Sequence, residues 1–441
     1  MVVGGGIAGT SAAIELADDG WQVILLEARP RLGGAVYSFT RHGMTVDTGQ
    51  HVLLRAYTGY RRLLERMGVA HLVTQQDRLD IPVLRPGKPT VHLRRAAHAP
   101  APFHLLPTLL RYSPLSAAQR IRVGRAVVAL RRVDYDDERR DLETFGAWLR
   151  RHGQGDEEIA ALWAMVCVAA LNIGVDEASL GLAARVFRTG LLDVADNGDL
   201  AIPEAPLSEL HDVAARRLLD RLGVRYRLGE KVVAIEAGSG LLLRTATGEL
   251  EADAVVVAVP HRNAATLVPQ VAAPDRDEWA RLGSAPIVNV HLRYERPVTT
   301  LRFAAVLDSP VPWFFDRTHA AGCDGQYLVV SLSGADADLR RPAEELIRVH
   351  RDALAALFPA ARSTPVAESF VTREPHATFR QQAGTLSLRP LTGTRLQGVV
   401  LAGAWTRTGW PDTMEGAVHS GVVAARALRV PEQARRVEAA T

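Results

Sequence analysis

The order of apolar and polar residues divides the chain into three stretches that alternate strands with helices, separated by two longer stretches. The first begins with Val2-Val3, passes through a glycine-rich turn into an apolar helix, and reaches Gly20, which ends that helix. A largely apolar run at 21–26 then leads to Glu27. Such runs are typical of strands in a parallel sheet buried on both faces. The pattern therefore predicts a βαβ unit, and it leaves open whether the first strand begins upstream.

The other two α/β stretches lie in the middle and at the end of the chain. The middle one predicts an amphipathic helix at 210–222, strands at 231–235 and 254–259, and a hairpin of 241–245 with 249–253. The last one predicts a strand at 399–403, a loop, and a helix from Met414 to about Leu428. Each stretch thus supplies strands and helices of the kind that form a doubly wound sheet.

The three stretches predict a single nucleotide-binding domain made of residues 1–70, 205–265 and 371–430. Residues 71–204 are expected to be mostly helical, and residues 266–370 strand-rich, with strands at 287–293, 303–307 and 327–332. These two insertions would form a substrate-binding and membrane-facing domain, followed by a tail at 431–441. The expected fold class is therefore α/β: a Rossmann-like domain built from three chain segments, with an inserted α+β domain.

The first turn carries a nucleotide fingerprint, Gly4-x-Gly6-x-x-Gly9, between a strand and a helix. The first glycine permits the tight turn, the second lets a pyrophosphate approach the backbone, and the third lets the helix pack closely on the strand. Free N–H groups at the helix start, including those of Ile7 and Ala8, would bind the phosphates. The alternative is a glycine-rich turn without a ligand.

The residues that follow indicate which nucleotide is bound. Glu27 lies at a strand end, 18 residues after the last fingerprint glycine, where it can accept hydrogen bonds from a ribose without a 2′-phosphate. This favours FAD or NAD over NADP. The next loop runs through Ala28 and Arg29 to the pair Gly33-Gly34. Its arginines could meet phosphate, and its glycines let the backbone pass close to a cofactor.

At this second glycine pair the chain resembles the flavin-containing amine oxidase and phytoene desaturase superfamily, in which the pair completes the FAD site. Residues 46–54 resemble the DNGQH segment of the squalene-associated FAD-dependent desaturases, the hydroxysqualene dehydroxylases of hopanoid biosynthesis. Residues 401–421 resemble the C-terminal FAD motif of that family. The resemblance covers essentially the whole chain and is weakest in the middle. The chain departs from the family at Ala35, Thr48 and Ala404, where Arg, Asn and Asp are common.

The resemblance implies FAD as cofactor and adds further contact residues to those of the fingerprint. These are Gly49, Gln50, Val232, Gly403, Trp405, Thr413, Met414 and Glu415. A helix starting near Met414 would direct free N–H groups at the flavin edge that becomes negative on reduction. For Trp405 and Trp410, packing in the core or at a domain interface is as strongly expected as a place in the substrate tunnel.

The implied reaction is the reduction of hydroxysqualene to squalene by reduced FAD with loss of water, which needs an acid near the leaving oxygen. His51 and Gln50 are the candidate catalytic residues, because the segment after Asp47 passes the flavin ring in this superfamily. A histidine can hold a proton near neutral pH, although His51 could instead serve only as a hydrogen-bonding group. Asp47 is expected to fix the loop, while Tyr37 and Arg380 are weaker candidates.

Two other functions remain open. One is an FAD-dependent desaturase or oxidase of another isoprenoid or of an amine. The other is a non-catalytic escort protein that binds an isoprenoid without a working flavin, which the departures at Ala35 and Ala404 would favour. The electron donor that reduces FAD is not indicated by the sequence.

Composition excludes several classes. With 441 residues, 47% hydrophobic and 23% charged, the chain is not a disordered or fibrous protein. Cys167 and Cys323 lie far apart without a CxxC motif, so we expect no metal site and a reducing cytoplasm. The longest uncharged apolar run, 159–171, has 13 residues and predicts a buried helix, not a transmembrane anchor. We also expect no cleaved leader, because the glycine turn begins at residue 4.

The net charge of +3 conceals a local imbalance. Residues 81–133 contain ten basic residues and no acidic one, so the rest of the chain carries 3 − 10 = −7. Residues 103–112 add an apolar patch within this block. Together they predict peripheral contact with the inner face of an anionic membrane, where an insoluble isoprenoid would be met. The alternative is a solvated basic surface. Nucleic acid is not an expected partner, because no recognised binding motif is present.

Overall fold

The computed structural model describes residues 1–238 and 240–429. Its nucleotide-binding part is centred on a five-stranded parallel sheet with the strand order β10-β2-β1-β14-β20. The strands are Arg225–Leu228, Ile24–Glu27, Val2–Val3, Val255–Val257 and Val399–Leu401, in that order. Alternate residues of these strands belong to two different apolar clusters, so the sheet is buried on both faces. The expected tail at 431–441 lies outside the described residues.

Different elements cover the two faces of this sheet. On one face lie α1 (Ile7–Asp18), α2 (Thr58–Met67), α10 (Ala214–Arg221) and α15 (Met414–Ala427). On the other lie the antiparallel strands β11 (Val232–Ala237), β12 (Leu241–Thr245) and β13 (Glu249–Ala252), followed by α11 (His261–Leu267) and the 3₁₀ helix Arg276–Leu282. Helices α1 and α15 pack so closely that a Cβ atom on Gly421 would lie 2.2 Å from the Ala8 oxygen.

The inserted part contains a seven-stranded sheet with the order β19-β15-β18-β17-β16-β7-β8. Its strands are Val366–Thr378, Ala285–Tyr294, Gln326–Ser333, Trp313–Asp316, Phe303–Val306, Asp80–Leu84 and Val91–Arg94, in that order. Helix α13 (Ala343–Leu357) packs on one face of this sheet. The short helices α12 (Thr318–Ala321) and α14 (Pro359–Ser363) lie nearby in the chain.

Two small sheets join the parts. Strands β3 (Ser38–Arg41) and β4 (Met44–Asp47) form a hairpin. Strand β9 (Leu200–Pro203) pairs with β5 (Leu53–Leu54) and β6 (Val73–Gln75). The hairpin contacts the seven-stranded sheet through the apolar cluster that contains Val46, Tyr327 and Phe370.

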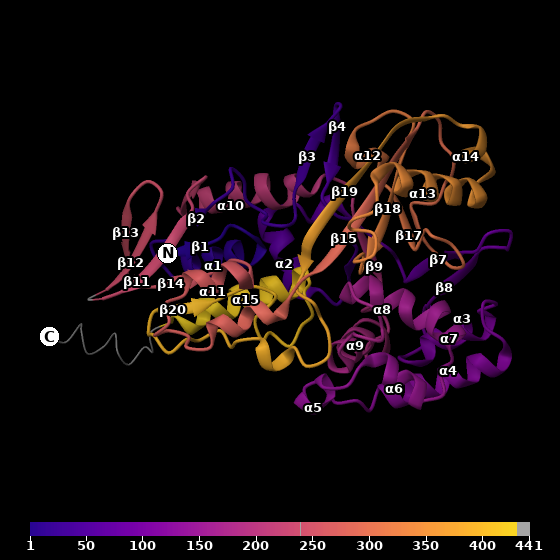
Figure 1. The fold of residues 1–441 in the computed structure, drawn as a ribbon, viewed down its shortest axis with the longest axis horizontal. Coiled ribbons are helices and arrows are strands. Elements are labelled where there is room, and N and C mark those ends of the chain that lie inside the picture. The colour runs from indigo at the N-terminus through magenta and orange to yellow at the C-terminus, as the bar shows by residue number, and fades with distance from the viewer. Residues whose placement is uncertain (239, 430–441) are drawn as a thin grey trace.

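A helical lobe completes the inserted part at the end of the molecule far from the five-stranded sheet (Figure 1). It contains α3 (Leu106–Arg111), α4 (Ala117–Leu130), α5 (Glu138–Asp141), α6 (Phe145–Arg151), α7 (Asp156–Glu158), α8 (Ala164–Leu171) and α9 (Leu180–Phe187). All of these helices except the short polar helices α5 and α7 contribute to one apolar cluster around Trp163 and Phe187. Within the described ranges, no helix has the length and apolarity needed to cross a membrane.

The structure refines several expected elements. The helix expected at 210–222 begins with a π-helical turn, Glu209–Val213, before α10. The run at 159–171 is helical and buried in part, but its first turn, Ile159–Trp163, is also a π-helix. Strands β7 and β8 lie inside the segment expected to be mostly helical, because they extend the seven-stranded sheet at its edge. Strand β19 runs across residue 370, where the sequence placed a domain boundary.

Candidate cofactor site and the sheet face opposite it

The fingerprint turn has no room for side chains at two of its glycines. Gly4 has φ +107°, and a Cβ there would lie 2.4 Å from the Ala258 oxygen. A Cβ on Gly9 would lie 1.9 Å from the Gly4 oxygen. At Gly6, by contrast, the nearest atom to a Cβ is the Gly34 Cα at 3.7 Å. The chain itself therefore does not require glycine at position 6, which fits a position kept open for a ligand.

The start of α1 is suited to an anion. Gly6 is its N-cap, so no side chain caps the helix, and its first turn contains no acidic residue. The N–H groups of Ile7 and Ala8 lie in that first turn, where helices leave their N–H groups without intrahelical partners. The positive end of the helix dipole adds to the attraction for a phosphate.

The second glycine pair lies against this turn. The N–H of Gly33 donates to the Gly5 oxygen over 2.9 Å, and a Cβ on Gly34 would lie 2.9 Å from the Gly6 Cα. Glu27, at the end of β2, is buried and accepts hydrogen bonds from the N–H groups of Gly5 (2.6 Å) and Arg29 (2.7 Å). Its carboxylate oxygens keep further lone pairs for a ribose. The turn from Gly4 to Gly9, Glu27 and the pair Gly33-Gly34 thus form one site, which we call the glycine cradle.

Other expected contact residues are placed around the cradle. Ala28 and Arg29 are exposed at its rim. Val232 is buried in β11, in the cluster that also contains Leu26. Gly403, two residues after β20, has φ +138° and donates its N–H to the Ser420 hydroxyl over 2.8 Å.

The Asp47 carboxylate is held from three sides. It accepts hydrogen bonds from the Ser38 hydroxyl (2.6 Å), the Leu207 N–H (3.0 Å) and the Arg317 guanidinium (2.7 Å). Asp47 and Arg317 are both buried. The structure therefore gives Asp47 the loop-fixing position expected of it. It also identifies Arg317, which lies in no motif, as the residue that ties this loop to the inserted part.

His51 is half-buried and lies four residues along the chain from Asp47. Its Nδ1 lies 3.2 Å from the Gly49 oxygen. Burial lowers its pKa, and the charge of Arg317 lowers it further, against the opposing effects of Gly49 and Asp47. The imidazole is therefore neutral at pH 7, a state that favours hydrogen bonding over proton donation. Gln50, half-buried beside it, has no hydrogen bond within the described part of the chain.

The C-terminal motif forms the start of α15. The Thr413 hydroxyl caps the helix by accepting from the Gly416 N–H over 3.1 Å. Met414 is the first helical residue and is buried. The Glu415 carboxylate accepts from the N–H groups of Gly59 (3.0 Å) and Tyr60 (2.8 Å), so its side chain caps α2. Its side chain thus joins the start of α15 to the start of α2.

The two tryptophans of this motif have different surroundings. The Trp405 ring lies 5.2 Å from that of Trp279, and its Nε1–H donates to the Val259 oxygen over 3.0 Å. This is the core packing that was one of the two expectations for Trp405. Trp410 is half-buried and meets the edge of the Tyr57 ring at 6.1 Å. Trp410 is thus the tryptophan that retains accessible surface near α15.

Arg389 holds the loop of the C-terminal motif, although no sequence pattern pointed to it. Its buried guanidinium donates to the backbone oxygens of Ala404 (3.0 Å), Thr406 (2.6 Å) and Trp410 (2.8 Å). Burial lowers its pKa to about 10, so it stays charged at neutral pH. Nearby Asp412 accepts from the Phe379 N–H over 2.8 Å, and burial raises the pKa of this carboxyl to about 6.

One face of the seven-stranded sheet carries a row of polar residues, Asn289, Thr372 and Glu374, which we call the polar row. Asn289 contacts the loop that follows Asp47. The Asn289 Nδ2–H donates to the Thr48 oxygen over 3.2 Å, while its buried Oδ1 has no partner within the described residues. Thr372 is its cross-strand neighbour in β19, so it shares that face. Glu374, two residues further along β19, lies on the same face opposite Ile287.

Glu374 is the carboxyl group on this face that lies within range of the Arg31 charge, and Arg31 in turn contacts the second glycine pair. Burial raises its pKa, and the facing charge of Arg31 opposes that shift. The Arg31 guanidinium donates to the Gly34 oxygen over 2.9 Å and lies 3.4 Å from the centre of the Tyr37 ring. Arg373, the next residue to Glu374, points the other way and donates to backbone oxygens near α13. Glu374 lies in no sequence motif.

The remaining candidates have structural partners. Arg380 donates to Glu177 (2.6 Å) and Asp336 (3.1 Å), so two carboxylates neutralise its charge. Cys167 is buried and Cys323 half-buried, both as free thiols. Over residues 1–238 and 240–429, no group of three His, Cys, Asp or Glu side chains could hold a metal ion.

A separate open cavity of about 580 Å³ lies beside Arg317. Glu204, Arg302, Asp316 and Asp324 contribute charged groups to its lining. Charges of both signs make this cavity unsuited to a long hydrocarbon.

Comparison with known proteins places these features in a family context. The family model described as flavin containing amine oxidoreductase matches residues 7–429. Hydroxysqualene dehydroxylase of Sinorhizobium fredii is 28% identical over 438 residues, which cover 95% of each chain. Zeta-carotene desaturase of Zea mays is 28% identical over 469 residues, covering 95% of this chain and 81% of that protein.

Solved structures show the same fold. An oxidoreductase from Methanosarcina mazei superposes with a TM-score of 0.74 at 16% identity, covering 96% of this chain and 99% of the other. Putrescine oxidase bound to putrescine gives a TM-score of 0.72 at 18% identity, with 96% and 97% covered. At these identities the likeness concerns the fold alone. It agrees with the α/β class expected from the sequence.

Proposed function

Because the chain belongs to the flavin containing amine oxidoreductases, we propose that it binds FAD and reduces hydroxysqualene to squalene with loss of water. The observation that carries this proposal is the segment from Asp47 to His51, the part of the chain that resembles hydroxysqualene dehydroxylases most specifically. Arg317 fixes this segment between the glycine cradle and the inserted sheet. The relatives named hydroxysqualene dehydroxylase, which match over nearly the full length of both chains, support the proposal.

The residues of the cradle fit the FAD nucleotide. The first-turn N–H groups of α1 would bind the pyrophosphate, and Gly6 would give it access to the backbone. Glu27 would accept a hydrogen bond from the adenosine ribose. The start of α15 would approach the flavin ring with its N–H groups, which Thr413 only partly occupies. When bound and reduced, FAD would supply the hydride that replaces the hydroxyl group.

An apolar region begins directly after His51. Val52 and Leu54 pack against the large cluster that fills the helical lobe around Trp163 and Phe187. A hydrocarbon chain gains free energy by leaving water for such surroundings, roughly 0.8 kcal/mol per buried methylene. We infer that the isoprenoid lies along this side of the site, with its hydroxyl group toward the polar row of the seven-stranded sheet.

We further propose Glu374 as the proton donor. Loss of the hydroxyl group requires a proton on its oxygen, so that the C–O bond breaks and water leaves while the hydride adds to the same carbon. Burial lowers the pKa of His51, so its imidazole is neutral at pH 7 and is a poor proton donor for this step. The carboxyl of Glu374 holds its proton to higher pH than an exposed glutamate does, and it shares a face of the sheet with Asn289, which binds the loop that follows Asp47. Asn289, with its free Oδ1, would orient the substrate hydroxyl.

Anaerobic mixing of the reduced, flavin-loaded protein with hydroxysqualene tests the reaction. The expected result is reoxidation of the flavin and formation of one squalene per flavin. If neither occurs while the oxidised protein dehydrogenates a carotene precursor, the second candidate is correct, namely an isoprenoid desaturase. That candidate is favoured by the similarity to zeta-carotene desaturases. A purified protein without flavin would instead indicate an escort function.

A further inference from the structure

Two neighbouring helices of the helical lobe expose large apolar side chains. On and before α3 these are Phe103, Leu106 and Leu110, and on α4 they are Ile121 and Val128. Their exposed fractions range from 47% to 63%. Arg120 of α4 donates to the backbone oxygens of Leu110 and Leu115, which fixes the end of α3 beside the start of α4. We call these five apolar residues, together with Arg111, Arg125, Arg131 and Arg132, the α3–α4 surface.

Helix α4 is apolar on both sides. Val123, Ala126 and Leu130 are buried against the lobe. The opposite stripe, Ile121, Arg125 and Val128, repeats at intervals of four and three residues and is exposed. This double pattern explains why the sequence shows no single apolar face over 115–132. An exposed stripe that alternates apolar side chains with arginine is typical of a helix that lies in a membrane interface.

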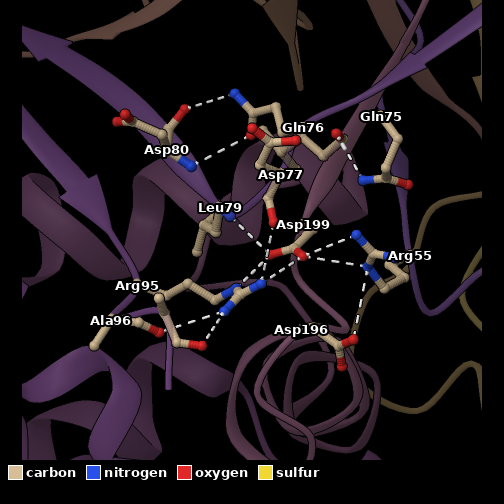
Figure 2. A network of polar contacts seen from close by, with 12 residues as sticks. Arg55, Gln75, Gln76, Asp77, Leu79, Asp80, Arg95, Ala96, Asp196 and Asp199 are labelled. Atoms are coloured by element: carbon tan, nitrogen blue, oxygen red, sulfur yellow. Dashed lines mark hydrogen bonds and ion pairs between the residues drawn. The ribbon is translucent and has the colours of Figure 1, made fainter. Parts of the chain in front are cut away.

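The ten basic residues of 81–133 fall into two groups, those with partners inside the protein and those without an acidic partner. Arg95 is buried and binds Asp199 at 2.6 Å, in the network that Figure 2 shows with Arg55 and Leu79. Arg122 pairs with the buried Glu158, and Arg94 pairs with Asp80 over 3.2 Å. These three arginines and Arg120 are therefore engaged by partners within the protein.

The other basic residues of the block have no acidic partner within the described part of the chain. They are Arg85, Lys88, Arg111, Arg125, Arg131 and Arg132. The last four belong to the α3–α4 surface. Unpaired positive charge is therefore concentrated where the apolar side chains are exposed.

Apolar packing is continuous between the inner side of this surface and the candidate site. Leu105 and Leu109 of the α3 region and Val123 of α4 pack into the large apolar cluster of the lobe. Val52 and Leu54, which follow His51, pack against the same cluster. One apolar region thus extends from beneath the α3–α4 surface to the residues next to His51.

We propose that the α3–α4 surface docks on an anionic lipid bilayer, with its apolar side chains in the interface and its arginines against the headgroups. Complementary charge selects anionic lipid, and the exposed leucines, isoleucine and phenylalanine select a bilayer over nucleic acid, whose contacts are polar. The inference rests on the proposed function only where it identifies the substrate as an isoprenoid that arrives from the membrane. Docking itself follows from the surface.

Flotation of the flavin-loaded protein with vesicles tests this proposal. One vesicle population is phosphatidylcholine, and the other contains roughly one third phosphatidylglycerol. We expect the protein to float with the anionic vesicles and much less with the neutral ones, and high salt to release it. Changing Arg125, Arg131 and Arg132 to Gln should weaken binding about fivefold per residue. Ile121→Ser with Val128→Ser should weaken it by about tenfold or more.

Matched controls lie elsewhere on the protein. Val271→Ser with Leu391→Ser changes two equally exposed apolar residues, and Arg348→Gln with Arg395→Gln changes exposed arginines; these variants should float like the unchanged protein. No flotation with anionic vesicles, or equal loss in the control variants, would overturn the proposal. Vesicle binding that is unchanged in the α3–α4 variants would also overturn it. So would binding that is displaced by DNA but not by lipid.

The outcome is independent of catalysis. Flotation needs no substrate, whereas turnover of detergent-dispersed hydroxysqualene needs no membrane. Protein that floats as expected but forms no squalene would leave the docking surface intact and reject the proposed function. The opposite result would reject the docking surface alone. Bound-flavin absorbance checks that each variant is folded.

Discussion

The Asp47 carboxylate lies 2.7 Å from the Nη2 atom of Arg317, and both side chains are buried although 270 residues separate them. Arg317 follows β17 of the inserted sheet, while Asp47 ends β4. Asp47 also binds the Leu207 N–H, so one carboxylate joins three distant parts of the chain. The pair therefore sets the position of the loop that carries His51.

Removing one member of this pair should be costly. Arg317→Met leaves the Asp47 charge buried without a partner, and we expect the free energy of unfolding to fall by about 3–5 kcal/mol. The double variant Asp47→Asn with Arg317→Met should regain part of that loss. Denaturant unfolding measures both. Arg302→Gln, which breaks the more exposed pair with Glu204, is the control and should cost about 1 kcal/mol or less. If the double variant regained nothing, the pair would not be coupled.

Gly9→Ala should reduce flavin binding. A Cβ at this position would overlap the Gly4 oxygen, so α1 must shift away from the strand and move its first-turn N–H groups. We expect severalfold less flavin per protein and a loss of about 1–3 kcal/mol in stability. Flavin absorbance and thermal unfolding provide the two measurements. Gly124→Ala, a helical site with nothing near its Cβ, should instead leave flavin content unchanged and stabilise slightly.

Glu374→Gln should lower the rate of squalene formation by about 10²- to 10⁴-fold, because the amide cannot donate the proton. In the unchanged protein the rate should fall as pH rises through the pKa of Glu374. Its ionisation near Arg31 should also produce a pH-dependent change in the flavin spectrum, which the variant lacks. Glu368→Gln on the same strand, where Glu368 pairs with Arg41 and His42, is the control. A normal rate in Glu374→Gln would exclude it as the donor.

Asp412 should make folding stability depend on pH. Its folded pKa of about 6 lies above the usual value of 3.8. Below the usual value both states are protonated and the group has no effect. As pH rises toward 6, the unfolded state loses its proton first, so stability should fall, by up to about 3 kcal/mol. Asp412→Asn keeps the acceptor for the Phe379 N–H and should flatten this slope. Urea unfolding at several pH values compares the two proteins; equal slopes would contradict the assignment.

The parts of the structure that the sequence predicts well depend on local patterns. The turn from Gly4 to Gly9 and the helix from Met414 are recognisable because glycine spacing and apolar periodicity are properties of a few consecutive residues. The hairpin at 241–253 was likewise predicted within a residue or two. Strand β7 was not, because Pro82 interrupts its pattern; it pairs with β8, which follows it in the chain, and with the distant β16.

The residues that the sequence does not reveal act through distant partners. Arg317 and Arg389 are two of fifty arginines, and only the fold shows that one binds Asp47 and the other the loop at 404–410. Glu374 becomes a candidate acid only because β19 pairs with β15 and turns it toward Arg31. The protonation state of His51 also depends on its burial, which a motif does not specify.

The order of strands in the five-stranded sheet affects how the chain can fold as it is synthesised. Strand β14 pairs with β1 on one side and with β20 on the other, yet β20 is made only at residues 399–401. Until then β14 presents an unpaired edge, and α15 is not yet present to pack on α1. Contacts of such long sequence separation form slowly and leave apolar surface exposed meanwhile. The nascent chain should therefore depend on chaperones, and it should acquire its cofactor only after release from the ribosome.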